Sequence, residues 1–224
     1  MTKALAFAKL DLITIKPYFT WKNLVILVGV ALVMSWNSTS TPATIGFIMM
    51  FGSLYVSYPF SVGEKNGIDA LYATLSITRA AVVLGRYFFA LAFNLCTAAL
   101  AFIVTCTLSI TLKKNWDPKE TLLVTLAILV AYSAIQAFQL PIYFKLGYSR
   151  AKLIAYLPLI GWPLVVTGLS FGLERVGIIG NFSNIILWIE QNTILFVISC
   201  AALWIVIMYF SYRISLSYYQ KRDF

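Results

Sequence analysis

Long stretches without a charged residue divide this sequence into apolar segments separated by short polar ones. After Lys22 no charge occurs before Glu64, and the polar run from Asn37 to Pro42 divides that interval in two. Four further charge-free intervals follow, and about 20 apolar residues are enough to cross a bilayer as a helix. The predicted transmembrane helices cover residues of about 18–36, 43–60, 81–112, 121–143, 153–173 and 192–218.

These six helices leave no room for a second globular domain, so the pattern predicts one all-α integral membrane domain over residues 1–224. Residues 1–17 are expected to form an interfacial helix. They do not resemble a signal peptide, because Lys9 and Asp11 interrupt any apolar core. The amphipathic pattern is imperfect, since Lys9 and Lys16 share a helix face and Asp11 lies nearly opposite.

Composition agrees with a membrane protein and excludes a soluble enzyme. Apolar residues make up 61% of the chain, charged residues 11%, and the mean hydropathy is +0.86. With the N-terminus inside, thirteen lysines and arginines fall on the cytoplasmic side and four outside. The positive-inside rule therefore predicts a multi-pass protein of the cell membrane with both termini in the cytoplasm. The net charge of +9 is explained by this bias and by contact with anionic lipid, so no nucleic-acid partner is expected.

The chain also lacks the residues that several chemistries need. It contains no histidine, which excludes Ser-His-Asp catalysis and HExxH zinc sites within the chain. It contains no GxxxxGK[ST] sequence, so it has no P-loop for ATP. We therefore expect no catalytic, cofactor or metal site here. If the protein is a pump, its motor is another polypeptide.

Few polar residues lie inside the predicted helices. Arg86 is the one ionisable candidate, and snorkelling to the cytoplasmic surface is the expected explanation. Asn94 lies in the third helix, and Ser133, Gln136 and Gln139 follow one face of the fourth at i, i+3 and i+6. They either hydrogen-bond between helices or form the weakly polar lining of a translocation path.

The loop at residues 61–80 falls on the cytoplasmic side and carries a short amphipathic pattern. Asp69 is placed to cap a short helix, and Leu71, Tyr72 and Leu75 then share one face. Such a helix either lies on the membrane or fits a groove on a cytoplasmic partner.

The run EKNGIDALYATLSITRAAVVLGRY resembles the first cytoplasmic loop of small permeases of type-2 ABC exporters. Those proteins read acidic-Lys-x-Gly, an amphipathic turn, Leu-Pro-Val-Ser/Thr-Arg and Gly-Lys/Arg-Tyr. Here Ser76 replaces the usual proline, and the last motif is Gly85-Arg86-Tyr87. A second similarity is PIYFKLGY, at the end of the fourth helix, to the motif Pro-x-x-Phe-Lys-x-Gly.

The resemblance implies a half-transporter. Two six-span subunits would pair as a homodimer through spans one and five, each resting on a separate ABC ATPase subunit that binds ATP and Mg. The loop at 61–80 would be the coupling helix, and residues 174–191 would form short re-entrant outer helices. The implied contacts with the ATPase are Glu64, Lys65, Asp69, Leu71, Tyr72, Leu75, Tyr148 and Arg150.

The resemblance also implies a bacterial exporter of an apolar or amphipathic substrate. Compact members of the family resemble exporters of phenol-soluble modulins or bacteriocin-immunity pumps, which favours a peptide. Export of a lipid or a drug, a motor-free facilitator or scramblase, and a membrane anchor or sensor without transport are the alternatives.

Overall fold

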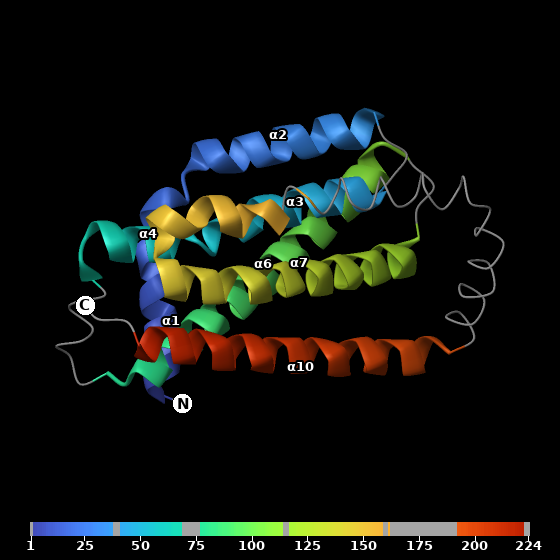
Figure 1. The fold of residues 1–224 in the computed structure, drawn as a ribbon. Helices are drawn as coiled ribbons and strands as arrows, with labels where there is room; N and C mark the ends of the chain where they lie inside the picture. The colour runs from blue at the N-terminus through green and yellow to red at the C-terminus, as the bar shows by residue number, and fades with distance from the viewer. Residues whose placement is uncertain are drawn as a thin grey trace.

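The computed structural model describes residues 2–37, 41–68, 77–113, 117–158, 161 and 192–221. Every regular element in these ranges is a helix, as the sequence predicts (Figure 1). A short helix at 148–158 follows α7. The other elements are α1 (Thr2–Ile15), the 3-10 turn η1 (Lys16–Tyr18), α2 (Trp21–Asn37), α3 (Thr41–Tyr55), α4 (Tyr58–Lys65), α6 (Arg79–Thr111), α7 (Pro118–Leu146) and α10 (Thr193–Gln220).

Four helices of the described part are long and apolar enough to cross a bilayer: Thr41–Lys65, which joins α3 and α4, then Arg79–Thr111, Pro118–Leu146 and Val197–Gln220. With 17 residues, α2 reaches about 26 Å, slightly less than the hydrocarbon thickness of about 30 Å. Counting α1 and α2 as one bent span would give a fifth. The predicted helix at 153–173 lies mostly outside the described residues, as does the outer segment 174–191, so six spans stay a prediction.

The first helix lies across the ends of the others instead of alongside them (Figure 1). The chain bends by 81° between Ala4–Tyr18 and Trp21–Trp36. One face of α1 is buried, and it carries Ala4, Phe7, Asp11 and Ile15 at the spacing of successive helical turns. Asp11 thus lies on the face of α1 that packs against protein, which explains why it is opposite Lys9 and Lys16.

The centre of the bundle is α6, which packs against α1, α2, α3, α7 and α10. Near α1 the core is mostly aromatic, with Phe60, Phe89, Tyr143 and Phe144 among its buried side chains. A second cluster further along α3 and α6 uses smaller residues, including Ala98 and Ala101. The outward face of α10 stays apolar and exposed, as expected for contact with lipid or another membrane chain.

Local sequence signals set the helix boundaries. The hydroxyl of Thr78 accepts a hydrogen bond from the Ala81 N–H at the start of α6. Asp117 caps α7 by accepting from the Lys119 N–H, and Pro118 occupies the first helical position. Gly147 ends α7 at φ 77° and ψ 170°, a conformation that only glycine adopts easily.

The bundle has one end at which the chain segments predicted to be cytoplasmic gather. α1, the end of α4, the start of α6, the end of α7 and the end of α10 all lie there (Figure 1). The described ends of the two predicted inner loops therefore lie at the same end of the bundle.

Candidate coupling site

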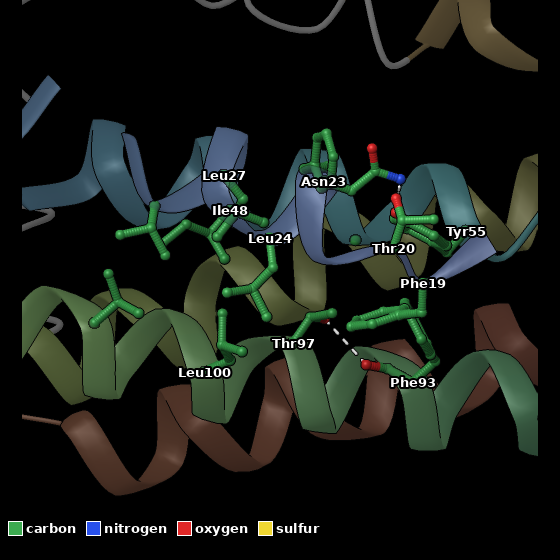
Figure 2. A pocket seen from close by; sticks show the side chains of 14 residues that line it. Phe19, Thr20, Asn23, Leu24, Leu27, Ile48, Tyr55, Phe93, Thr97 and Leu100 are labelled. Carbon is green, nitrogen blue, oxygen red and sulfur yellow. Dashed lines mark hydrogen bonds between the residues drawn. The ribbon is translucent and has the colours of Figure 1, made fainter. Parts of the chain in front are cut away.

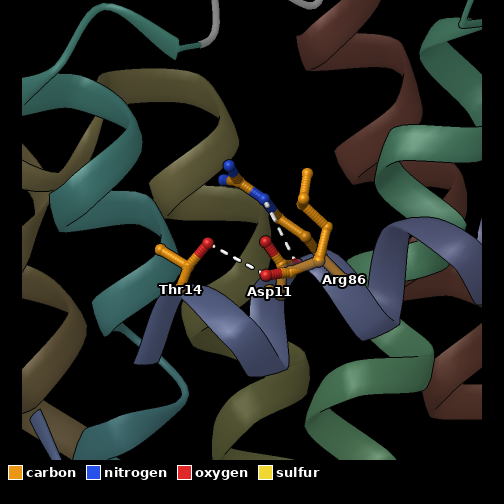
Figure 3. Close-up of polar contacts among 4 residues, drawn as sticks. Asp11, Thr14 and Arg86 are labelled. Atoms are coloured by element: carbon orange, nitrogen blue, oxygen red, sulfur yellow. Dashed lines mark hydrogen bonds and ion pairs between the residues drawn. The ribbon is translucent and has the colours of Figure 1, made fainter. Parts of the chain in front are cut away.

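Arg86 lies at the centre of this end of the bundle, inside the protein. Its Nε lies 4.0 Å from Oδ2 of Asp11 on α1, and both side chains are 3% exposed (Figure 3). The guanidinium also lies 4.0 Å from the centre of the Phe60 ring and 5.7 Å from that of Phe144. Asp11, Phe60, Arg86 and Phe144 form what we call the Arg86 junction, which joins α1, α4, α6 and α7. The expectation that Arg86 snorkels to the surface is wrong, because a carboxylate and two aromatic faces stabilise it in the interior.

The glycine before Arg86 lets α1 come this close. A Cβ built on Gly85 would lie 2.8 Å from the Ala4 carbonyl oxygen and 2.9 Å from the Phe7 Cβ. No side chain fits there unless α1 moves. Gly85 therefore sets the distance at which Asp11 can reach Arg86.

The tyrosine after Arg86 joins α6 to α10. The Tyr87 hydroxyl lies 2.5 Å from Ser211 Oγ and 2.8 Å from Ser215 Oγ, and all three side chains are buried. Ser211 donates its single proton to the Ala137 carbonyl at 2.5 Å. Tyr87 must then donate to Ser211 and accept from Ser215.

That carbonyl needs an outside donor because of a proline. Pro141 lies inside α7 and has no N–H to donate to the carbonyl four residues earlier, which is that of Ala137. The Ser211 hydroxyl replaces the missing bond, so the proline in α7 is compensated from α10.

A side chain of the first inner loop also binds the second one. The Glu64 carboxylate accepts a hydrogen bond from the Ser149 N–H at 3.0 Å. Ser149 lies in the first turn of the helix at 148–158, where N–H groups have no partner within the helix and a negative charge is favourable. The end of α4 and the start of this helix are thus held together.

Aromatic contacts lead from the second loop to the Arg86 junction. Tyr148 stacks on Tyr143 at a ring distance of 6.0 Å, and Tyr143 lies 5.0 Å from Phe60. Burial, with a smaller contribution from Tyr156, raises the pKa of Tyr148, so its hydroxyl stays neutral at physiological pH. Both loops therefore connect physically to the residues around Arg86.

The start of α6 is also fixed to the C-terminal end of α10. Arg79 donates hydrogen bonds to the carbonyl oxygens of Tyr219 and Gln220. These carbonyls belong to the last turn of α10, where a positive charge is favourable.

The structure describes half of the predicted ATPase contacts. Glu64, Lys65 and Arg150 are exposed at the inner-loop end, and Tyr148 is half-buried beside them. The other four predicted contacts lie outside the described residues, so the coupling helix itself stays a prediction. They are Asp69, Leu71, Tyr72 and Leu75.

The polar residues suggested for a translocation path are buried and bonded within the protein. Asn94 and Gln136 exchange two hydrogen bonds, at 2.6 and 2.9 Å, which join α6 to α7. Gln139 donates to the Ala155 carbonyl, and Ser133 to the Leu129 carbonyl one turn earlier. For Asn94, Gln136 and Gln139 this geometry favours the interhelical interpretation, whereas Ser133 bonds within α7. A path along these residues stays a prediction.

Comparison with known proteins fits this arrangement of helices and loops. A family model described as ABC-2 family transporter protein matches residues 8–220, nearly the whole chain. The chain belongs to the ABC-2 family of transporter proteins. No curated protein and no solved structure gave a significant match.

As an ABC-2 permease the chain is a membrane subunit of a transporter, and such subunits normally work with a separate ATPase. The match includes α1 from Ala8 onward, the inner-loop end and α10, so the Arg86 junction lies wholly within the family domain.

Proposed function

We propose that this chain is the permease half of an ATP-driven exporter. Two permease chains and two separate ATPase chains form the working complex, with both permease termini on the cytoplasmic side. The single observation that carries the proposal is the ABC-2 family match over residues 8–220. The described ends of both inner loops lie at one end of the bundle, where Glu64 binds Ser149, and this supports the proposal because an ATPase has to engage both loops together (Figure 1).

ATP and Mg belong to the partner in this proposal. When the ATPase subunits close on ATP, they push the coupling helix proposed for the loop at 61–80, which begins within α4. Phe60 in α4 lies on Arg86, so the push reaches α6, and through Asp11 it reaches α1. The Glu64 contact with Ser149 makes the second loop move with the first.

The cargo is apolar or amphipathic, and we favour a peptide. The reason is the scarcity of fixed charge in the described transmembrane part: its buried ion pair, Asp11 with Arg86, lies at the inner-loop end and is closed off by aromatic rings. The buried amides of Asn94 and Gln136 are bonded to each other. A charged cargo would find few groups there to replace its water.

Isolation of the tagged chain from native membranes in mild detergent tests the proposal. We expect a P-loop ATPase to co-purify in equal amount and to hydrolyse ATP, while the chain freed from it hydrolyses none. Hydrolysis by the chain alone would refute the proposal. A chain that moves an amphipathic peptide or a lipid in vesicles free of any ATPase would instead be a motor-free facilitator or scramblase.

A second experiment tests the coupling surface. Tyr72→Ala/Leu75→Ala removes two side chains whose burial would contribute about 1.5–3 kcal/mol each, so the affinity for the ATPase should fall about a hundredfold or more. Asp69→Ala should cost about 1 kcal/mol as a lost helix cap. The matched control is Leu122→Ala/Leu123→Ala, two exposed residues of α7 at the opposite end of the bundle. If the double variant binds the ATPase normally, Tyr148 and Arg150 become the next candidates.

A further inference from the structure

A cavity of about 230 Å³ lies between α2, α3 and α6 and plays no part in the mechanism above (Figure 2). Phe19, Tyr55 and Phe93 line one end of it, and Leu27 and Leu100 line the other. It therefore runs along the helices, starting beside the corner where η1 meets α2.

The residues that line the cavity favour an apolar ligand. Its lining is almost entirely aliphatic and aromatic, and its amide group is already bonded: Asn23 donates to the Tyr18 carbonyl and to the Tyr55 hydroxyl. The Thr97 hydroxyl likewise donates to backbone carbonyls of its own helix. Water needs two to four polar partners to stay in a cavity, so this one is dry or filled by hydrocarbon.

Its shape suits an extended alkyl chain. From Asn23 to Val28 the lining follows α2 for about 8 Å, and from Phe93 to Val104 it follows α6 for about 16 Å. Acyl chains of a bilayer also run along the direction of the transmembrane helices. A lipid chain can therefore enter this cavity without changing its orientation.

The charges beside the cavity indicate the kind of lipid. Lys16 in η1 and Lys22 in the first turn of α2 flank the lining residues Phe19 and Thr20, and both lysines are exposed. They lie at the end of the bundle that carries most of the positive charge of the sequence. An anionic headgroup is attracted to such a pair, whereas a zwitterionic one gains much less.

We infer that this cavity, together with Lys16 and Lys22, is a binding site for an anionic phospholipid of the inner leaflet. One acyl chain occupies the space between α2, α3 and α6, and the phosphate lies beside the two lysines. The site is distinct from the inner-loop contacts, so it does not depend on how the chain engages an ATPase.

The test uses the full chain in nanodiscs of phosphatidylcholine that contain a trace of phosphatidylglycerol with a photoreactive diazirine on one acyl chain. We expect crosslinks on residues that line the cavity. Val104→Phe fills its far end and should lower their yield at least about fivefold, whereas Ile103→Phe should not, because Ile103 is 60% exposed on the outside of α6. If Val104→Phe fails to fold, Leu24→Phe with Val25→Phe as its control gives the same comparison, since Val25 is 52% exposed.

The headgroup is tested separately. Unlabelled phosphatidylglycerol should compete about tenfold or more better than phosphatidylcholine, and Lys16→Gln/Lys22→Gln should remove that preference while chain labelling persists. Lys113→Gln, at the opposite end of the bundle, should leave it unchanged. Equal labelling of Val104→Phe and wild type would overturn the site. Displacement of the label by an amphipathic peptide but not by phosphatidylglycerol would also overturn the site and would identify a cargo site instead. A crosslink between two Val25→Cys copies that excludes the lipid would overturn it as well.

Discussion

The Arg86 junction can be tested by removing its two charges first singly and then together. In Arg86→Met the Asp11 carboxylate stays buried without its cation, and in Asp11→Leu the guanidinium loses its anion. Both side chains are 3% exposed, so each single change should lower the free energy of unfolding by about 3–5 kcal/mol. Asp11→Leu should fall at the lower end of that range, because Phe60 still offers its ring face to the cation.

The double variant Asp11→Leu/Arg86→Met should be far more stable than either single variant. It leaves no buried charge and keeps similar side-chain volume, so its stability should lie within about 1 kcal/mol of wild type. The coupling energy, which is the effect of the double variant minus the sum of the two single effects, then has a magnitude of about 5–9 kcal/mol. This pattern distinguishes a buried pair from two charges that merely face the interface.

The assay is unfolding by SDS in dodecyl maltoside micelles, followed by tryptophan fluorescence, since the chain has six tryptophans. As a control, Lys119→Met/Glu120→Leu removes two exposed charges at the start of α7 and should change stability by no more than about 0.5 kcal/mol. Additive effects of Asp11→Leu and Arg86→Met, or singles as stable as wild type, would refute the reasoning. Arg86 would then reach water, as the sequence alone suggested.

Three further predictions concern the same end of the bundle and its orientation. Gly85→Ala should destabilise the protein by about 1–3 kcal/mol, because the new methyl group would collide with α1. Gly29→Ala, in open space on α2, should stabilise the protein by about 0.5–1 kcal/mol. Equal shifts in the SDS midpoint of the two variants would contradict the close approach of α1 to Gly85. Ser211→Ala should lower the free energy of unfolding by about 1–2 kcal/mol, because the Ala137 carbonyl and the Tyr87 hydroxyl each lose a hydrogen-bond partner. The loss should disappear in the background Pro141→Ala/Tyr87→Phe, which supplies the missing N–H and removes the hydroxyl. An undiminished loss in that background would show that Ser211 does not compensate for the proline. In a variant without Cys96, Cys106 and Cys200, Ser40→Cys and Lys119→Cys should react with an impermeant thiol reagent on intact cells and Asn66→Cys should not; external labelling of Asn66→Cys would invert the topology.

The helical architecture could be predicted from charge spacing because lipid leaves the chain few other options. Backbone groups in hydrocarbon must bond within their own segment, so an apolar run of this length forms a helix. The boundaries of α7 also follow from local signals, namely Asp117 with Pro118 at one end and Gly147 at the other. The bend between α1 and α2 also has a local signal, Pro17 in η1, but that proline does not say which face of α1 packs on α6, and this decides which way Asp11 faces.

The ion pair of Asp11 with Arg86 was missed for a physical reason. Helical periodicity places Asp11 opposite Lys9 and Lys16, but it does not say whether that side meets lipid, water or protein. A single arginine two turns into a span is equally ambiguous, because an arginine that snorkels to the surface and one that is buried in an ion pair look the same in the sequence. Asp11 lies on the face of α1 opposite the lysines, and Arg86 lies deeper in α6 than a snorkelling residue needs to. Each position is explained once the two residues are considered as an ion pair.

Each residue of the motif Gly85-Arg86-Tyr87, on which the sequence resemblance partly rests, makes a specific contact in the structure. Three consecutive helical residues point in three directions about 100° apart, so each can meet a different neighbour. Gly85 admits the backbone of α1, Arg86 binds Asp11 and lies on Phe60 and Phe144, and Tyr87 bonds to the serines of α10. A change at Gly85 displaces α1 and with it Asp11, whereas a change at Tyr87 acts on the contact with α10. In the proposed mechanism, α6 is therefore the helix through which movement of the inner loops reaches the rest of the bundle.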